Sequence, residues 1–339
     1  MQATDIPGCV DIVATNPILG PRYRGAIAAL EDAWTRLLGR EAFRSVVFEE
    51  IDGSDVRLLG SGTSVFATDD FARQIKTPPF FWIGPELARR FARGESPLLS
   101  DAEVRRDNSS GGLNLVVWEC GLLPSHVDRF DMIHKTVWTF VEQHRGFLIK
   151  EWITQTPTVA ALRAAISSGA LQANPVDGSY VSPLDGDADA IFRQPHVLGL
   201  TRSLLERRAG SSVSFVFAYR APRLGLRPSE QRLLLAAMGG GTDQEIATEL
   251  AISLSTVKKT WRSIHERASP HVPGLVPLIP TIGVDRTVRG KEKKQQVLMY
   301  VREHPEELRP ANRKARATTS EPQRRSIAAT YWSKSVRRS

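Results

Sequence analysis

The feature that most constrains this chain is a run of three short helical segments between residues 226 and 268, each with its own start or stop signal. The first opens with Pro228, a residue favoured in the first turn of a helix, and ends at the three glycines 239–241. The second begins at Thr242, which opens a Thr-x-x-Glu capping box, and the third is capped by Ser253. Apolar residues recur at helical spacing in all three segments, so each is predicted to bury one face.

The third segment divides into two faces. Its apolar face consists of Val257, Trp261, Ile264 and Ala268. Its opposite face carries Ser255, Lys258, Lys259 and Arg262. Two short helices joined by a tight turn, the second basic on its outer face, form a helix-turn-helix. Such a helix suits the DNA major groove, because the basic side chains can neutralise phosphates while Ser255 and Thr256 are short enough to approach base edges.

The same pattern also fits a second class of protein. A small bundle of three helices with one basic face can act as an interaction module that docks an acidic protein partner, or can simply pack. Periodicity and charge on residues 226–268 do not separate these two interpretations.

Residues 226–268 resemble the LuxR/GerE-type helix-turn-helix domain of bacterial transcription regulators, over 43 positions without a gap. The matching residues are Leu226, Pro228, Glu230, Leu234, Gly240, Thr242, Glu245, Ile246, Ala247, Leu250, Ile252, Ser253, Thr256, Val257, Lys258 and Ile264. The resemblance implies a cytoplasmic regulator that binds double-stranded DNA, acts with RNA polymerase and forms a homodimer. It also implies that Thr256, Val257 and Lys258 lie at the DNA-facing start of the recognition helix.

The chain departs from the family pattern in several places. Thr260, Gly241 and Arg227 stand where the family usually has His, an apolar residue and Thr. More important, a fourth helix used for dimer contacts usually follows the recognition helix, whereas prolines interrupt residues 270–280 here. We therefore expect the helical pattern at 291–304 to supply the missing packing or dimerising helix.

The first 220 residues predict an α+β sensory or regulatory domain, by analogy of the GAF or PAS kind. Helices are predicted at 23–38, 127–143, 158–168 and 195–208, and strands at 45–50, 56–60, 113–118 and 212–219. In the helix at 127–143, the apolar stripe is expected to face inward, as is Trp138. The predicted organisation is thus a domain at 1–220, the helix-turn-helix at 226–268, a proline-rich segment with an amphipathic helix at 271–309, and a tail at 310–339.

Charge is distributed unevenly along the chain. The formal net charge is +8, yet residues 286–339 alone hold 15 Lys and Arg against 5 Asp and Glu. An excess of this kind points to a polyanion, nucleic acid first. Because the helix-turn-helix itself is nearly balanced, the basic tail at 310–339 is predicted to be disordered and to add non-specific attraction to phosphates.

Other function classes find little support in the sequence. No HExxH or GxSxG motif occurs and the histidines lack metal-ligand spacing, so we expect no enzyme, cofactor or metal; His126 and His134 beside Asp128 and Asp131 only imitate an acid–base cluster. A sigma-factor-like role would need a polymerase-binding region that the chain does not show. Cys9 and Cys120 suit a reducing cytosol, and no apolar run could span a membrane.

A small-molecule effector is possible, but the sequence does not place its site. The tryptophans that could line an apolar pocket are Trp34, Trp82, Trp118, Trp138 and Trp152, although tryptophans more often belong to the core.

Overall fold

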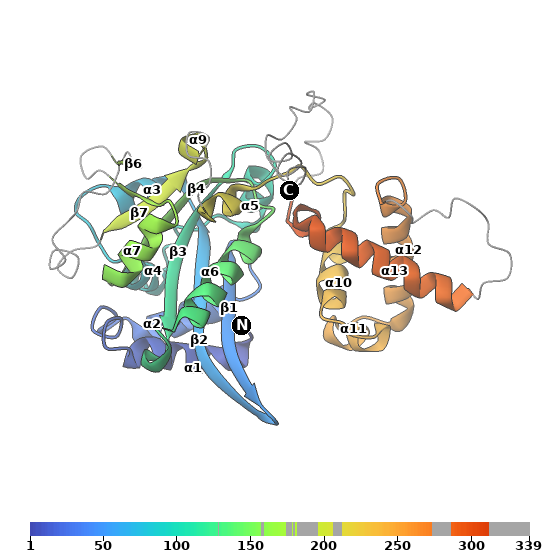
Figure 1. Ribbon diagram of the computed structural model, residues 1–339, viewed down its shortest axis with the longest axis horizontal. Helices are drawn as coiled ribbons and strands as arrows, with labels where there is room; N and C mark the ends of the chain where they lie inside the picture. The colour runs from blue at the N-terminus through green and yellow to red at the C-terminus, as the bar shows by residue number, and fades with distance from the viewer. Residues whose placement is uncertain are drawn as a thin grey trace, which may run out of the picture.

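The computed structural model describes residues 1–127, 129–156, 159–173, 178, 180–181, 196–205, 212–272 and 286–311. Its buried hydrophobic residues form two large separate clusters, one drawn from residues 6–217 and one from residues 224–308. In Figure 1 they correspond to a body with a sheet and a smaller body made of helices. The predicted mixture of α and β structure is confirmed. The second core unites the segments predicted separately at 226–268 and 271–309.

The sheet of the larger body is mixed and has the order β1-β2-β3-β4-β7-β5-β6. Its strands are β1 (Phe43–Asp52), β2 (Asp55–Ala67), β3 (Leu113–Leu122), β4 (Ile149–Gln155), β5 (Leu171–Ala173), β6 (Tyr180–Val181) and β7 (Val197–Thr201). Pairing is antiparallel except between β3 and β4. Gly53, in the β1–β2 turn, has a φ of 62°, a conformation that glycine adopts without steric cost.

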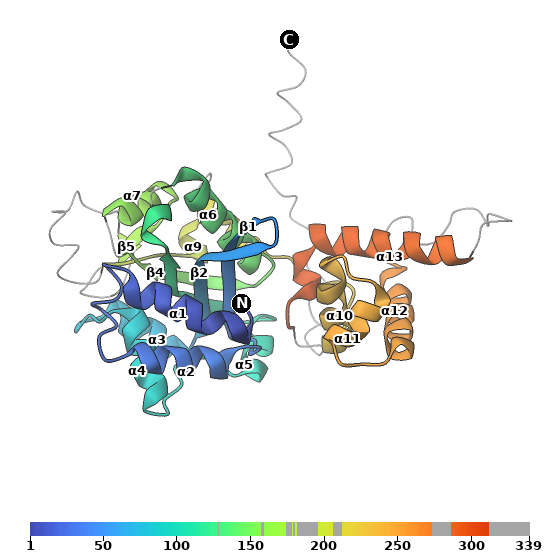
Figure 2. The same cartoon turned by 90° about the horizontal axis from the view of Figure 1, so that it is seen from below.

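Helices cover both faces of this sheet (Figure 2). One face carries η1 (Ala3–Asp5), α1 (Ile6–Thr15), α2 (Ile27–Leu37), α3 (Asp69–Lys76), α4 (Ile83–Ala92) and α5 (Asp101–Asp107). The other carries α6 (Phe130–His144) and α7 (Val159–Ser167), with α6 in contact with η3 (Ser212–Phe217). Short turns complete the body at η2 (Pro124–His126) and α9 (Arg202–Leu205). The sheet is thereby enclosed, which explains why β3 and β4 are buried along most of their length.

The helix predicted at 127–143 exists as α6, but its apolar stripe does not point into the core. Phe130 is 83% exposed, and Ile133 and Val137 are exposed as well. Trp138, expected in the core, is 58% exposed. Val141 and His144, in the C-terminal half of α6, are buried. The periodicity therefore predicted the helix correctly, but it did not predict which of its apolar residues are buried.

The prediction of a helix at 195–208 is wrong for residues 197–201, which form the strand β7. The single turn α9 follows this strand. Residues 197–200 are buried without interruption, and β7 pairs with both β4 and β5. A short apolar run buried on both faces reads alike as a strand or a helix, and here the pairing with two neighbouring strands favours the strand. Residues 195 and 206–208 lie outside the described residues.

The strand predicted at 212–219 is also wrong, because residues 212–217 form the 3-10 helix η3. The predicted alternation required Val213, Phe215 and Phe217 on one buried face. Instead Val213, Val216 and Phe217 are buried while Phe215 is 59% exposed. Burial at positions i, i+3 and i+4 suits a helical turn, and this turn packs against α6 rather than extending the sheet.

The smaller body contains α10 (Pro228–Met238), α11 (Asp243–Glu249), α12 (Leu254–Ala268), α13 (Arg286–Glu303) and η4 (Pro305–Leu308). The predicted starts at Pro228, Thr242 and Ser253 are confirmed, with the last two as N-caps. The helix expected at 291–304 is α13, and its Val297 and Val301 are fully buried in the same core as α10 and α12. It therefore packs within its own chain. Residues 273–285 and the predicted tail from residue 312 onward lie outside the described residues.

The segment after α13 joins the two bodies. Arg309 is buried: its Nε donates to the carbonyl of Arg145 at 3.0 Å, and a terminal nitrogen donates to the carbonyl of Glu142 at 3.1 Å. Asn108 Nδ2 donates to the carbonyl of Pro310 at 2.7 Å. The chain that follows α13 is thus fixed to the C-terminal end of α6.

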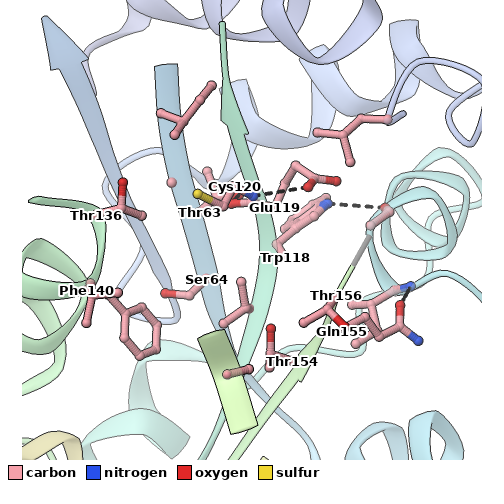
Figure 3. A pocket seen from close by; sticks show the side chains of 18 of the residues that line it. Thr63, Ser64, Trp118, Glu119, Cys120, Thr136, Phe140, Thr154, Gln155 and Thr156 are labelled. Atoms are coloured by element: carbon pink, nitrogen blue, oxygen red, sulfur yellow. Dashed lines mark hydrogen bonds between the residues drawn. The ribbon is translucent and has the colours of Figure 1, made fainter. Parts of the chain in front are cut away.

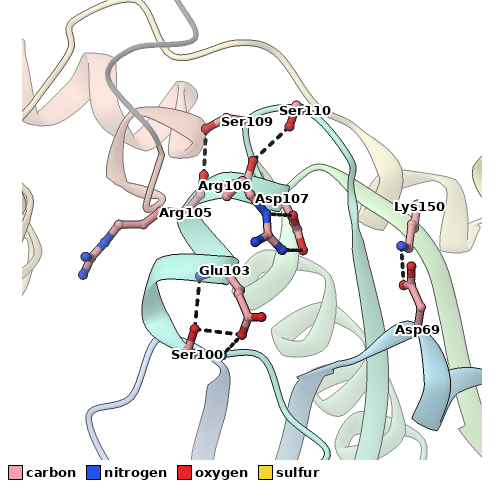
Figure 4. Close-up of polar contacts among 9 residues, drawn as sticks. All are labelled: Asp69, Ser100, Glu103, Arg105, Arg106, Asp107, Ser109, Ser110 and Lys150. Atoms are coloured by element: carbon pink, nitrogen blue, oxygen red, sulfur yellow. Dashed lines mark hydrogen bonds and ion pairs between the residues drawn. The ribbon is translucent and has the colours of Figure 1, made fainter.

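Asn108 itself is positioned by α5, whose start and end are closed by local contacts (Figure 4). Ser100 and Glu103 form a capping box at its first turn. Ser109 Oγ donates to the carbonyl of Arg105 just beyond its last turn. Among the helices of the described residues, none is both long and apolar enough for a membrane span.

Candidate nucleic-acid interface

The candidate interface is the outer face of α12, and its position follows from the inner face of the same helix. Val257, Trp261, Ile264 and Ala268 recur at helical spacing and are all at most 3% exposed. They pack in the core shared with α10 and α11. The helix begins at Ser253, whose Oγ accepts a hydrogen bond from the Thr256 backbone N–H at 3.1 Å.

The predicted basic residues of α12 lie together on its solvent side. Lys258, Lys259 and Arg262 are exposed. Towards the residues that the structure describes, these three side chains make no ion pair or hydrogen bond. Unpaired cations gathered on the solvent side of one helix form a surface that can neutralise neighbouring phosphates without first breaking internal contacts.

The two hydroxyl residues predicted to approach bases lie at the start of the same helix. Ser255 and Thr256 are exposed, and the Oγ of Ser253 is 2.8 Å from the hydroxyl oxygen of each. Three hydroxyl groups therefore meet at one helix N-terminus, where the aligned peptide dipoles favour an anion. To contact a base or phosphate, Ser255 and Thr256 must exchange this local hydrogen bonding for the ligand.

Val257 is a correction to the predicted site. The family resemblance placed it at the DNA-facing start of the helix, but its side chain is fully buried. It occupies the position one turn before Trp261 on the apolar face, so it fixes the angle of α12 and cannot reach DNA with its side chain.

A hollow of about 310 Å³ lies between α12 and α13, with Glu266 among the residues that line it, and no sequence pattern had placed α13 there. Lys258 and Arg262 of α12 and Lys294 of α13 lie around it. Lys294 is held by Asp243, with Nζ 2.6 Å from Oδ2, and lies over the Trp261 ring. Burial, together with the nearby Lys293 and Lys294, lowers the pKa of His265 in the same hollow.

A buried carboxylate ties α10 to α12. Glu230 is 2% exposed, and its Oε1 accepts hydrogen bonds from Ser263 Oγ at 2.7 Å and from Arg267 Nε at 3.2 Å. Its Oε2 accepts from the backbone N–H of Arg227. In the sequence Glu230 stood out only as a position that matches the family pattern, and these contacts give it the further role of orienting α12.

The imitation acid–base cluster is not assembled. His126 is buried and its Nδ1 lies 2.9 Å from Ser125 Oγ, whereas His134 is exposed and stacks on Phe130. Asp131 pairs with Arg129, and Asp128 lies outside the described residues.

The five tryptophans considered for an apolar pocket do not all meet. Trp82, Trp118 and Trp152 line a common cavity, whereas Trp34 is buried in the core and Trp138 is exposed.

Comparison of the chain with protein families, with curated proteins and with solved structures finds no match.

Proposed function

We propose that this chain is a sequence-specific DNA-binding transcription regulator of the LuxR/GerE type. In this proposal α11 and α12 form the helix-turn-helix, and α12 enters the major groove of double-stranded DNA. The observation that carries the proposal is the exposed face of α12, where Lys258, Lys259 and Arg262 are all unpaired within the described residues and the helix start is lined with hydroxyls. A groove about 12 Å wide admits one helix presented in this way.

The remaining parts take their roles from this assignment. The larger α+β body, of GAF- or PAS-like kind, senses a signal or otherwise mediates regulation. The regulator acts in the cytoplasm as a homodimer and contacts RNA polymerase. Because α13 is packed on α10 and α12 of its own chain, its buried face is not available for dimer contacts, and a dimer would use another surface.

The test is a gel-shift titration at several salt concentrations with Lys258→Ala and Lys259→Ala. The DNA is a duplex selected by the wild-type protein from a random pool, with an unselected duplex beside it. A variant that makes one phosphate contact fewer releases fewer counterions from the DNA when it binds. Each variant should therefore bind both duplexes more weakly, and the magnitude of the slope of log K against log salt should fall by about 0.9.

Lys135→Ala is the matched control, because Lys135 is an exposed lysine of α6 in the larger body and should leave the slope unchanged. Ser255→Ala should reduce the preference for the selected duplex rather than the slope. Unchanged affinity and slope in both lysine variants would contradict the assignment of α12. It would then favour the alternative, in which the helical body is an interaction module that docks an acidic protein.

A further inference from the structure

The first half of α6 carries an apolar face that is exposed to water. Its residues are Phe130, Ile133, Val137 and Trp138. Their spacing places them on one stripe along the helix surface. Figure 3 shows Thr136 and Phe140 on the inner side of the same helix, directed towards the strands of the sheet. A contiguous exposed patch of apolar side chains marks an interaction surface, so the apolar face of α6 is a candidate docking site.

The size of this face suits a short segment of chain better than a second globular protein. One large aromatic side chain presents about 150–250 Å², so the exposed parts of the four side chains amount to about 400 Å². A stable interface between two globular proteins buries about 800 Å² on each partner. A few apolar residues on a peptide are enough to cover the face.

The chain contains such a peptide beyond the described residues. Residues 312–339 hold eight Lys and Arg against one Glu, which makes them basic overall. Yet their last part includes Ile327, Tyr331, Trp332 and Val336. Counted from Ile327, these residues follow at intervals of four, five and nine, the spacing of one helical face. Because Trp and Tyr are the residues that most often anchor an interface, residues 327–336 are called the docking segment below.

The junction between the two bodies brings the docking segment within reach of α6. Arg309 is hydrogen-bonded to the carbonyls of Glu142 and Arg145, at the C-terminal end of that helix. Phe130 lies about 21 Å from this end, because an α-helix rises 1.5 Å per residue. Residues 312–326 separate the last described residue from the docking segment, and a random coil of this length spans about 20 Å. A tether that matches the distance in this way gives a local concentration in the millimolar range.

Charge favours one direction of the docking segment along α6. The β1–β2 hairpin lies beside the start of α6, where Phe48 and Leu59 pack with Met132. The exposed carboxylates of this hairpin are Glu49, Glu50, Asp52 and Asp55. A segment that starts from the C-terminal end of α6 and runs towards Phe130 brings the basic residues at 334–338 to these carboxylates. Exposed ion pairs add little affinity, but they do set orientation.

We propose that residues 327–336 dock on the apolar face of α6 in the same chain. Trp332 and the other apolar side chains of the docking segment cover the stripe from Trp138 to Phe130, and residues 334–338 lie beside the hairpin. Docking holds the basic tail on the larger body, so the docked chain lacks the non-specific attraction to phosphates that a free tail adds. Only this consequence rests on the proposed DNA-binding function, since docking itself requires no DNA.

The test attaches the fluorophore bimane to α6 of the full chain in the absence of DNA. His134→Cys provides an exposed attachment point within the apolar face, and Cys120→Ser removes the other exposed thiol. Tryptophan quenches bimane on contact, and Trp138 does so equally in every chain compared. At a millimolar local concentration, a segment with a Kd of about 0.1 mM is docked in about nine chains of ten, so Trp332→Phe should raise the emission at least about twofold. Phe130→Ser should raise it as well, because the largest exposed side chain of the face is lost.

The matched controls use the same label and the same kind of substitution elsewhere. Bimane on Glu31→Cys, at an exposed residue of α2 across the sheet, should not respond to Trp332→Phe. Leu235→Ser changes an exposed apolar residue of α10 and should leave the emission from position 134 as it was. Equal emission with and without Trp332 would overturn the docking.

A mixing experiment separates docking within one chain from docking between two copies. Unlabelled wild-type chain is added in excess to the labelled chain that carries Trp332→Phe. For docking within one chain, the emission should stay high, and the quenching in the labelled chain with Trp332 should not change on dilution. Quenching of the mixture would show that the face accepts the tail of another copy, and would overturn docking in the same chain. No result depends on whether the chain binds DNA.

Discussion

A fully buried histidine lies at the end of α6. His144 is fully buried, with Nδ1 2.7 Å from the carbonyl of Phe140 and Nε2 2.6 Å from Ser64 Oγ. These contacts suit a neutral ring that donates from Nδ1 and accepts at Nε2. Burial, and to a smaller extent the nearby Arg44 and Arg309, lowers the pKa of His144 to about 3.

This histidine should make folding stability depend on pH. Its pKa is about 3 in the folded chain and about 6.5 in the unfolded chain, so the unfolded state takes up the proton first as the pH falls. Stability from this group is therefore complete above the unfolded pKa. Between about pH 7 and pH 5 we expect a loss of about 2 kcal/mol in the free energy of unfolding, measured by urea denaturation.

His144→Gln removes the titrating group and should flatten this part of the pH dependence, although the variant is less stable overall. His134→Gln is the control, because His134 is exposed on the same helix. If His144→Gln and the wild type lost equal stability between these pH values, the buried histidine would not be the cause.

Among the contacts between helices in the helical body, the one made by Glu230, which orients α12, should lower the free energy of unfolding most when it is removed. Glu230 accepts three hydrogen bonds, from Ser263, Arg267 and the backbone of Arg227. Glu230→Ala leaves these donors unpaired in a largely buried place, and we expect a loss of about 3 kcal/mol in the free energy of unfolding. Glu249→Ala changes an exposed glutamate of α11 and should stay within about 0.5 kcal/mol in the same denaturation measurement.

An effect of Glu230→Ala on DNA affinity at a temperature where the variant is fully folded would show that the contact also sets the angle of α12. Equal stability of the two glutamate variants would contradict its orienting role.

The sequence predicted the elements best where their limits are set locally. Thr242 and Ser253 cap α11 and α12 through hydrogen bonds that span three residues, so their positions can be read from the chain alone. By contrast, the fate of residues 197–201 and 212–217 depends on neighbours far along the chain. β7 is a strand because β4 and β5 lie beside it, and η3 is helical because α6 covers it.

The candidate sites divide in the same way. The helical spacing of Lys258, Lys259 and Arg262 was enough to place them on one exposed face. Lys294 joins them through a helix that begins beyond residues 273–285, and nothing in the local pattern indicates that contact. The sequence also gave no sign that Trp152 Nε1 lacks a hydrogen-bond partner among the described residues, because a missing partner is a property of packing and not of spacing.

At the scale of the whole molecule, α6 connects the cavity to the helical body. Its middle lines the cavity through Thr136, Val137 and Phe140, and the carbonyls of Glu142 and Arg145 near its end hold Arg309. Arg309 also lies over the Phe147 ring, and burial lowers its pKa to about 9, which leaves it protonated at neutral pH. The end of α6 is thus hydrogen-bonded directly to the segment that follows α13.

Arg309→Met should release the helical body from the larger one without unfolding either. Methionine keeps the apolar contact with Phe147 but cannot donate to the two carbonyls, and each hydrogen bond lost from a charged donor weakens the junction by about 1.5–3 kcal/mol. Because each body has its own core, both should remain folded while the distance between them varies. Small-angle X-ray scattering should then show a larger radius of gyration, and calorimetry should show two unfolding transitions.

Arg302→Met is the control, because it alters an exposed arginine of α13 and should change neither measurement. A scattering curve identical to that of the wild type would mean that other contacts hold the bodies together, and that α6 does not communicate with the helices through Arg309.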